Sequence, residues 1–277
     1  MQTIESDYIK CCDCLEGMRQ LPDECIDLTV TSPPYDDLRS YNGYSFDFEN
    51  IAKELYRVTR LGGCVVWIVN DSTKNGSESG TAMRQALFFK DCGFNLHDTM
   101  IWYKDTFSFP EKNRYRQCFE YMFVFSKGKP QHTHLIADRR NKWAGATIHG
   151  TSRNVDGITY RKSNDKKSNV LEYGVRFNVW EIPTEKANKT GHPAVFPERL
   201  ANDHIISWSD VGDIVLDPFL GSGTTAKMAI MNYRHYIGFE ISEKYSEIAN
   251  NRIKTAIADR DKRSAWLDEI LGGDENA

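Results

Sequence analysis

The chain has 277 residues, of which 40% are hydrophobic and 27% are charged, and its formal net charge at pH 7 is −4. This length fits one large α/β domain with insertions, and the composition is that of an ordinary globular protein. The values exclude a nonspecific polycation, and the absence of any apolar run near ~20 residues excludes a membrane-spanning helix.

The N-terminal stretch and the cysteines indicate a cellular compartment. The opening MQTIESDYIKCC has neither the basic start nor the apolar stretch of a secretory signal, so we expect a cytoplasmic protein. Seven cysteines, an odd number, are expected to be reduced. Cys11 and Cys14 form a CxxC pair without a second pair, and His132 and His134 stand alone in a polar stretch. The sequence therefore predicts no metal site.

Strand-like and helix-like segments alternate through the first 130 residues. Apolar and branched runs predict strands over 8–12, 26–31, 64–69, 94–102 and 121–125. A helix is expected over 47–60, closed by Gly62 and Gly63, and a second one over 80–91. This alternation predicts a mostly parallel sheet with helices on both faces.

The pattern lapses between Gly128 and Val175, which is too long for a simple connection in a compact domain. From position 127 to position 176 there are eleven Lys and Arg residues but four acids. A basic insert on an acidic body favours contact with a polyanion, and a solvated lysine-rich loop is the alternative.

Regular structure is expected again after this insert. The remaining predicted elements are a helix over 197–208, a strand over 213–217, a helix over 224–231, a strand over 235–240 and a helix over 243–258. The final LGGDENA is expected to fray.

The second predicted strand ends unusually, in DLTVTSPPYDDL. Pro33 and Pro34 cannot donate a ladder hydrogen bond, so the strand must stop there, and each proline restricts the residue before it. The carbonyl groups of Ser32 and Pro33 and the ring of Tyr35 are thereby held in few directions. Rigid acceptors beside a stacking ring suit a flat ligand that carries an amino group, although an ordinary proline turn is the alternative.

A glycine turn follows the strand expected over 213–217, in IVLDPFLGSGTTAKMAI. Glycines at 221 and 223 would let a ligand approach the backbone, and the next helix would present free N–H groups. Glu240, nineteen residues after Gly221, is suited to accept hydrogen bonds from ribose hydroxyls. Asp217 would repel a pyrophosphate but could hold an ammonium group, which matches S-adenosylmethionine. A nucleotide-dependent oxidoreductase remains an alternative.

Together these motifs resemble the amino-group DNA methyltransferases, in particular the permuted beta group, where the catalytic (D/N/S)PP(Y/F) motif precedes the glycine motif. Further blocks similar to the family are CCDCLEGMRQLPDECIDLTVTSPPY, RVTRLGGCVVWIVND, CFEYMFVFSKGK and KTGHPAVFPERL. The resemblance covers most of the chain. It implies a Rossmann-like α/β fold in circularly permuted order, with an inserted target-recognition region.

The resemblance also implies roles for individual residues. The catalytic loop would be Ser32, Pro33, Pro34 and Tyr35. The cofactor S-adenosylmethionine would be bound by Asp13, His192, Pro193, Asp217, Phe219, Gly221, Gly223, Thr224 and Glu240. Candidates for DNA contacts in the insert are Arg139, Arg140, Asn141, Arg153 and Arg161.

The implied domain organisation has three parts. Residues 1–127 would form the catalytic half of the methyltransferase domain, residues 128–176 the target-recognition insert, and residues 177–277 the cofactor-binding half. Implied partners are double-stranded DNA, a second copy of the chain and a separate cognate restriction endonuclease, with no membrane.

The resemblance implies a site-specific enzyme that rotates the target base out of the duplex and methylates its exocyclic amino group directly. Ser32 stands where many adenine-modifying relatives carry Asp, which favours N4 of cytosine. The alternatives are an adenine-N6 enzyme of the same family and a noncatalytic DNA-binding relative.

Overall fold

The computed structural model describes residues 4–34, 46–106, 112–147, 151–161, 169–185 and 196–272. The chain divides into two compact units. The main unit comprises Met1–His134 and Asn178–Ala277, and the small unit comprises Leu135–Phe177.

An eight-stranded sheet forms the centre of the main unit, in the order β1-β14-β13-β2-β3-β7-β6-β12. Its strands are β1 (Tyr8–Cys11), β2 (Ile26–Thr31), β3 (Thr59–Val69), β6 (Asn95–Tyr103), β7 (Phe119–Ser126), β12 (Val179–Glu181), β13 (Ile214–Asp217) and β14 (His235–Glu240). Along this order, the first five strands, β1, β14, β13, β2 and β3, each pair in parallel with the next. Strands β6 and β12 also pair in parallel, whereas β7 runs antiparallel to both β3 and β6. The mostly parallel sheet expected from the sequence is confirmed.

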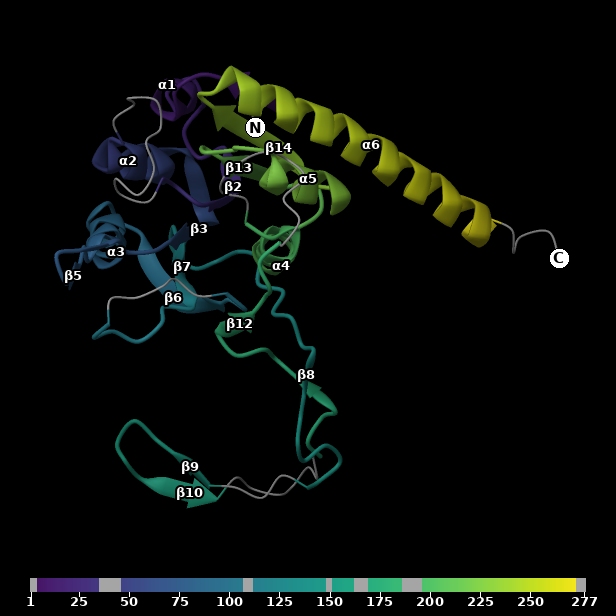
Figure 1. Ribbon diagram of the computed structural model, residues 1–277. Helices are drawn as coiled ribbons and strands as arrows, with labels where there is room; N and C mark the ends of the chain where they lie inside the picture. The colour runs from purple at the N-terminus through teal and green to yellow at the C-terminus, as the bar shows by residue number, and fades with distance from the viewer. Residues whose placement is uncertain are drawn as a thin grey trace. The chain divides into compact units, whose positions relative to one another are not determined.

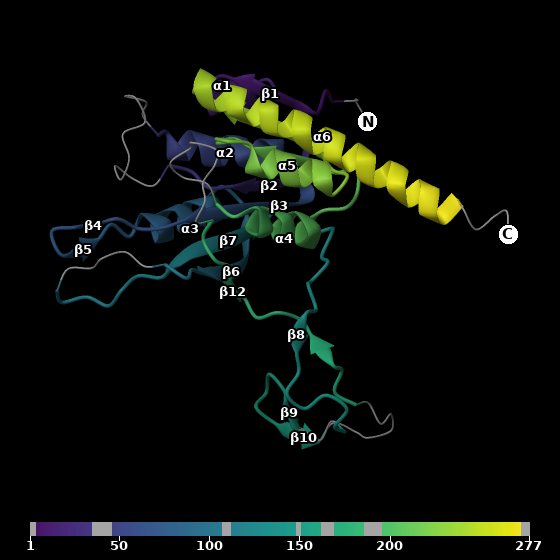
Figure 2. The ribbon, with the colours of Figure 1, turned by 45° about the vertical axis from the view of Figure 1, so that its right-hand side comes forward.

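Helices cover both faces of this sheet (Figures 1 and 2). One face carries α1 (Cys14–Met18), α2 (Phe48–Val58) and α3 (Thr81–Asp91), and the other carries α4 (Glu198–Trp208), α5 (Thr224–Met231) and α6 (Glu243–Gly272). Successive residues of β3 enter opposite cores, since Val65 and Trp67 pack on the first face and Val66 and Ile68 on the second. Burial on both faces explains why these strands read as continuous apolar runs.

The two central strands send the chain in opposite directions. From β2 the chain passes through α2 to β3, whereas from β13 it passes through α5 to β14 on the other side. This divergence makes the pair β2 and β13 the topological switch point of the sheet. Ligands of open α/β sheets bind in the crevice outside the carboxyl ends of such strands.

The glycines expected to close the first long helix lie elsewhere. Helix α2 ends at Val58, and β3 begins at Thr59, so Gly62 and Gly63 belong to the strand. A Cβ atom on Gly63 would come within 2.8 Å of the Asp27 carbonyl oxygen. The close approach of β3 to β2 therefore requires this glycine, and the prediction of a glycine-closed helix was wrong.

Helix α6 is longer than the sequence pattern indicated. It was expected over 243–258 but continues to Gly272, for a total of 30 residues. Leu271 and Gly272, which were expected to fray, are helical, and the rest of the tail lies outside the described residues. None of the described helices is both long enough and apolar enough to cross a membrane.

The small unit contains short antiparallel pairs. Strand β8 (Arg139–Arg140) pairs with β11 (Tyr173–Gly174), and β9 (Thr151–Arg153) pairs with β10 (Thr159–Arg161). In the main unit, a further short hairpin of β4 (Thr73–Lys74) and β5 (Ser77–Glu78) follows β3. Strands of two or three residues give no sustained alternation, which explains the lapse of pattern in this part of the sequence.

Candidate functional site

The two motifs singled out in the sequence meet at the carboxyl ends of β2 and β13. These strands pair in parallel, with Leu28 beside Val215 and Thr29 beside Leu216. Just beyond the paired residues, the Thr31 hydroxyl donates a hydrogen bond of 2.6 Å to the Asp217 carboxylate. A second buried bond of 3.1 Å runs from the Thr225 hydroxyl to the Val30 carbonyl oxygen. The proline-rich strand end and the glycine turn are thus fastened to one another.

The proline-rich end itself begins directly after β2. Ser32 and Pro34 are half-buried, and Pro33 is buried. The prolines lack the N–H groups that would extend the ladder, and β2 ends at Thr31 as expected. Tyr35, the fourth residue of the predicted catalytic loop, lies outside the described residues.

Asp217 is the buried carboxylate of the site. Its relative exposure is 2%, and it accepts hydrogen bonds from the Thr31 hydroxyl and from the Phe219 backbone N–H at 3.0 Å. Burial raises the pKa of Asp217 to about 6, because desolvation of the charged form outweighs these hydrogen bonds. The carboxylate is therefore charged above about pH 6.

The glycine turn leads from β13 into α5. Gly221 and Gly223 have φ angles of +54° and +84°, which suit glycine, and α5 begins at Thr224. Phe219 lies before the turn and is half-buried, with its ring 6.2 Å from that of Trp67. The first turn of α5 follows a left-handed glycine and so presents its N–H groups at the carboxyl edge of the sheet.

Glu240 closes the turn from the neighbouring strand. One of its carboxylate oxygens accepts the Gly221 N–H at 2.8 Å, and the other accepts the Ser242 N–H at 2.8 Å. Burial is the main influence on the pKa of Glu240 and raises it. The Ile241 N–H lowers the pKa of this carboxylate as a hydrogen-bond donor, and with about four lone-pair sites in all the group keeps capacity for a further donor.

Asp13 stands at the same edge of the sheet. The Cys12 N–H donates to the Glu240 carbonyl oxygen at 3.1 Å, which places the residues after β1 beside the end of β14. The Asp13 side chain caps α1 by accepting the Leu15 N–H at 2.8 Å. His192 and Pro193, the other two residues expected at the cofactor's edge, lie outside the described residues.

Sequence reasoning missed the arginine that supports the glycine turn. Arg252 of α6 donates to the Ser222 carbonyl oxygen at 2.7 Å and to the Thr224 hydroxyl at 3.2 Å. Its guanidinium also donates at 2.8 Å to Glu198 in the first turn of α4, which pairs with Lys227 of α5 at 2.6 Å. Burial raises the pKa of Glu198, but Lys227 and Arg252 outweigh it and leave that pKa lowered. No short motif surrounds Arg252, so its role could not be read from the sequence.

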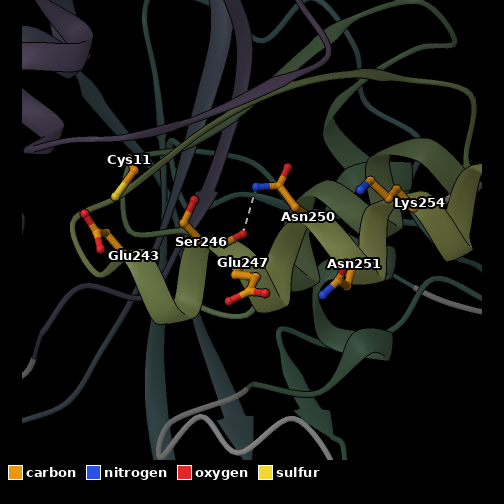
Figure 3. Close-up of a pocket in the computed structure, with 7 residues that line it drawn as sticks. All are labelled: Cys11, Glu243, Ser246, Glu247, Asn250, Asn251 and Lys254. Carbon is orange, nitrogen blue, oxygen red and sulfur yellow. Dashed lines mark hydrogen bonds between the residues drawn. The ribbon is translucent and has the colours of Figure 1, made fainter.

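A surface depression of about 440 Å³ lies beside the amino-terminal half of α6 (Figure 3). Cys11, at the end of β1, borders it together with side chains of α6 such as Glu243, Asn250 and Lys254. None of its seven lining residues is one of the predicted catalytic or cofactor-binding residues. The strand ends therefore define the candidate site better than this depression does.

The arginines expected to contact DNA serve partly internal roles in the small unit. Arg139 donates to the Val175 carbonyl oxygen at 3.0 Å, and its guanidinium lies 4.4 Å from the centre of the Phe177 ring. Arg153 donates to the Gly157 carbonyl oxygen, and Asn141 donates to the Leu171 carbonyl oxygen.

Two of the expected DNA-contacting residues differ from these. Arg140 is exposed. The side chain of Arg161 lies outside what the structure describes.

Comparison with known proteins places these features in a family. Residues 26–251 match the N6_N4_Mtase family, whose description is DNA methylase. The orphan methyltransferase M.BamHII of Bacillus amyloliquefaciens is 61% identical over 241 residues, which cover 84% of this chain and 90% of the relative. The DNA adenine methyltransferase YhdJ of Escherichia coli (strain K12) is 28% identical over 261 residues, which cover 88% and 81% of the two chains.

A solved structure shares the fold. The cytosine-N4-specific PvuII DNA methyltransferase aligns with a TM-score of 0.68 at 20% sequence identity. The alignment covers 94% of this chain and 93% of the other.

Proposed function

Since this chain belongs to the N6_N4_Mtase family of DNA methylases, we propose that it transfers a methyl group from S-adenosylmethionine to N4 of cytosine in double-stranded DNA. The coarser function is established by the family: the chain is a DNA amino-methyltransferase that depends on S-adenosylmethionine. The proposal concerns the target base and the roles of individual residues.

One observation carries these roles. The strand end with Ser32 and Pro33 is joined to the glycine turn through the 2.6 Å bond between Thr31 and Asp217 at the switch point of the sheet. A nucleobase held by the first motif and a cofactor held by the second would therefore share one crevice. This adjacency is what direct transfer between two bound molecules requires.

The residues at the glycine turn fit the cofactor. Glu240 has lone pairs left to accept from ribose hydroxyls, and Asp217 provides a negative charge beneath the turn for an ammonium group. We propose that Phe219, Gly221, Gly223 and Thr224 line the same binding site, with Asp13, His192 and Pro193 at its edge.

The chain's own residues then prepare the target nitrogen. When bound, S-adenosylmethionine supplies an electrophilic methyl group. Ser32 and the Pro33 carbonyl oxygen accept the two N–H hydrogens of the exocyclic amino group, which turns the nitrogen lone pair toward that carbon. Tyr35 stacks on the base, and Pro34 keeps the loop stiff. Fixed acceptors would stabilise the positive charge that develops on the nitrogen as the bond between the methyl group and the sulfonium sulfur breaks, and one N–H proton would then pass to solvent, so no covalent enzyme intermediate is needed.

The choice of cytosine depends on Ser32, which stands where many adenine-modifying relatives of the resembled family carry Asp. The shared fold with a cytosine-N4-specific enzyme is compatible with this choice. The relative YhdJ is an adenine methyltransferase, which keeps N6 of adenine as the second candidate target.

We further propose that the three expected regions have different functions. Residues 1–127 and 177–277 form the catalytic and cofactor-binding halves, and residues 128–176 recognise the target sequence. Phosphate contacts from the basic insert offset part of the cost of rotating the base out of the duplex. A relative described as an orphan methyltransferase supports action without a dedicated endonuclease, and a homodimer remains part of the proposal.

The decisive experiment identifies the modified base. Purified protein is incubated with methyl-labelled S-adenosylmethionine and duplex DNA, and the DNA is digested to nucleosides for mass spectrometry. We expect labelled N4-methylcytosine. Labelled N6-methyladenine would establish the second candidate instead, and unlabelled DNA despite binding of DNA and cofactor would indicate a noncatalytic relative.

A matched pair of variants tests the stacking role of Tyr35. Stacking of a base on an aromatic ring contributes about 1–3 kcal/mol, so Tyr35→Ala is expected to slow transfer roughly ten- to hundredfold. Tyr35→Phe keeps the ring and should stay near the wild-type rate, and cofactor affinity should change in neither variant. Equal losses of transfer and of cofactor binding would contradict this role.

A further inference from the structure

Two histidines and an aspartate gather near the amino end of β13, at the opposite end of that strand from the site described above. His132 and His134 follow β7, and Asp210 lies in the turn between α4 and β13. His132 Nδ1 is 2.8 Å from Asp210 Oδ2, and His134 Nε2 is 2.6 Å from Asp210 Oδ1. One donor atom from each of the three residues lies within 4.8 Å of the other two.

The backbone holds the two histidines in place. The Gln131 N–H donates to the Gly62 carbonyl oxygen at 2.9 Å, and the His134 N–H donates to the Ser207 carbonyl oxygen at 2.8 Å. Side chains two residues apart on an extended segment point to the same side. The two rings are accordingly nearly parallel, with an interplanar angle of 17° and centres 6.4 Å apart.

The carboxylate side of the cluster is equally well anchored. The Asp210 N–H donates to Asp213 Oδ2 at 2.7 Å, and the Asp213 N–H donates back to the Asp210 carbonyl oxygen at 3.1 Å. The His235 N–H fixes the Asp213 carbonyl oxygen at 2.9 Å. Asp213 also brings a second carboxylate oxygen to within 3.6 Å of His132 Nε2.

The charges around the cluster favour the binding of a cation. Asp210 and Asp213 contribute two carboxylates, and Arg234 is a neighbouring cation whose guanidinium donates to the Ser209 carbonyl oxygen at 2.6 Å. Side-chain exposures of 23% for His132 and 52% for His134 give an ion access from solvent.

We propose that His132, His134 and Asp210 form a binding site for a divalent transition metal ion of the zinc class. Two imidazole nitrogens and one carboxylate oxygen are a donor set that zinc takes in proteins, and Asp213 or water would complete four-coordination. Donor atoms around a tetrahedral ion with bonds of about 2.1 Å lie about 3.4 Å apart. The two His–Asp distances of 2.8 and 2.6 Å therefore have to open slightly, and any wider pair of donor atoms, at most 4.8 Å apart, has to close by up to about 1.4 Å to hold the ion.

The position of the site assigns it a stabilising role and separates it from methyl transfer. Asp213 precedes β13 and Asp217 ends it, so the two lie roughly 13 Å apart at ~3.3 Å per residue. An ion at His132 cannot touch the reacting atoms at the other end of the strand. It would instead join the segment after β7, which ends the first stretch of the main unit at His134, to the turn before β13.

Binding is tested with Co²⁺ as a spectroscopic substitute for zinc, on tag-free full-length protein. We expect one ion per chain and visible absorption bands of nitrogen and oxygen ligation, without thiolate-to-metal charge transfer. The last condition excludes the Cys11–Cys14 pair, where burial raises the pKa of the Cys14 thiol to about 12. Failure of the wild-type protein to bind Co²⁺ or Zn²⁺ saturably would overturn the proposal.

Variants locate the ion. His134→Ala and the isosteric Asp210→Asn are each expected to weaken Co²⁺ binding by more than roughly tenfold, because even outer partners of metal ligands contribute about 10- to 100-fold. The matched control is His235→Ala, which removes the single His–Asp pair at 2.7 Å with Asp7 and should leave binding unchanged. Undiminished binding in both cluster variants, or equal loss in the control, would place the ion elsewhere.

Thermal unfolding with and without Zn²⁺ supplies a second readout. A ligand that binds the folded state raises the unfolding midpoint, so zinc should stabilise the wild-type protein and the His235→Ala variant but not the cluster variants. Unfolding in the absence of metal checks that each variant folds. A zinc effect that is the same in all four proteins would argue against the site.

Discussion

Asp217 gains its charge only above about pH 6, because the protein buries it beneath the glycine turn. In the unfolded chain this carboxyl ionises near its ordinary pKa of 3.8, so between about pH 4 and pH 6 the folded state loses stability as the pH rises. In the proposed role of Asp217, an ammonium group on the cofactor needs the ionised form of this carboxylate. Cofactor affinity should therefore rise as the pH increases through about 6.

Thr31→Val tests this coupling. The Thr31 hydroxyl lowers the pKa of Asp217, so its loss should shift the pH midpoint of cofactor binding upward and lower stability by about 1–3 kcal/mol. Calorimetric titration of S-adenosylmethionine from pH 5 to pH 8 measures the midpoint. Thr59→Val, which removes another buried threonine bond, to the Leu55 carbonyl oxygen at 2.6 Å, should leave the midpoint unchanged. Affinity that is independent of pH in the wild-type protein would contradict the prediction.

His204 carries a second titration effect, located in the core. It is fully buried, with its ring stacked on Trp180 at 4.6 Å and Nε2 3.2 Å from the Met122 sulfur. Burial lowers the pKa of His204 to about 3, whereas the unfolded chain binds a proton near pH 6.5. Stability from this group is thus present above pH 6.5 and is lost as the pH falls toward 3.

His204→Leu should remove that dependence. One such group contributes a slope of up to about 1.4 kcal/mol per pH unit, so the variant should lose less stability than the wild-type protein between pH 6.5 and pH 4.5. Urea unfolding at several pH values measures the slope. Identical slopes in the two proteins would show that His204 becomes protonated without unfolding.

At the scale of elements, three helices meet beneath the glycine turn. Arg252 of α6 contacts the turn at Ser222 and reaches Glu198 of α4, to which Lys227 of α5 also donates. This network fixes the turn from below, while Glu240 fixes it from the neighbouring strand. The shape of the proposed cofactor site therefore depends on α6.

Arg252→Lys is expected to weaken cofactor binding about tenfold, which corresponds to about 1.4 kcal/mol. Lysine keeps the charge but cannot donate to Ser222, Thr224 and Glu198 in the planar arrangement of a guanidinium. Arg260→Lys, in an exposed pair with Asp261 on the same helix, is the matched control. Binding isotherms for S-adenosylmethionine decide the outcome, and equal affinity in both variants would remove Arg252 from the support of the turn.

Local patterns predicted the elements of the main unit well and their long-range contacts poorly. Strands β2 and β14 and helix α5 begin and end where the apolar periods place them. Gly62 and Gly63 misled, because a Cβ atom would meet Gln131 at the first position and Asp27 of β2 at the second, and no local signal reports such contacts between distant segments.

The missed parts of the two sites share one cause. Arg252 meets the glycine turn, and Asp210 meets the two histidines, through tertiary packing of segments that are distant in the sequence. The proline-rich end and the glycine turn could be paired in advance only because their joint order resembles a family. The glycine turn alone had left an oxidoreductase open, and the match over residues 26–251 decides in favour of a DNA methylase.

At the scale of the whole molecule, positive charge is concentrated in the insert. Between positions 127 and 176 the sequence contains eleven Lys and Arg residues but four acidic residues, in a chain whose net charge is −4. Within the small unit, Arg176 and Asp138 form a two-pronged pair with bonds of 2.7 and 2.6 Å. Some of the basic side chains thus organise the unit, and exposed ones such as Arg140 are available to phosphate.

Arg140→Ala is expected to weaken DNA binding and to reduce the slope of log affinity against log salt by about one, the value for one lost phosphate contact. Arg19→Ala removes an exposed arginine of the main unit and should leave the slope unchanged. Fluorescence anisotropy with a DNA duplex at several salt concentrations measures both slopes. An unaltered slope for Arg140→Ala would remove this residue from the DNA interface.

The pairing of β2 with β13 also has a consequence for biosynthesis. All six residues of β2 are buried in the finished protein, yet Thr31 and its partner Asp217 are 186 positions apart. A ribosome that adds about 5–20 residues per second leaves one flank of this strand without its neighbour for roughly 10–40 s. The unpaired, apolar edge of β2 can associate with other chains throughout this interval. The yield of folded protein in cells should therefore respond to chaperone supply and to translation speed.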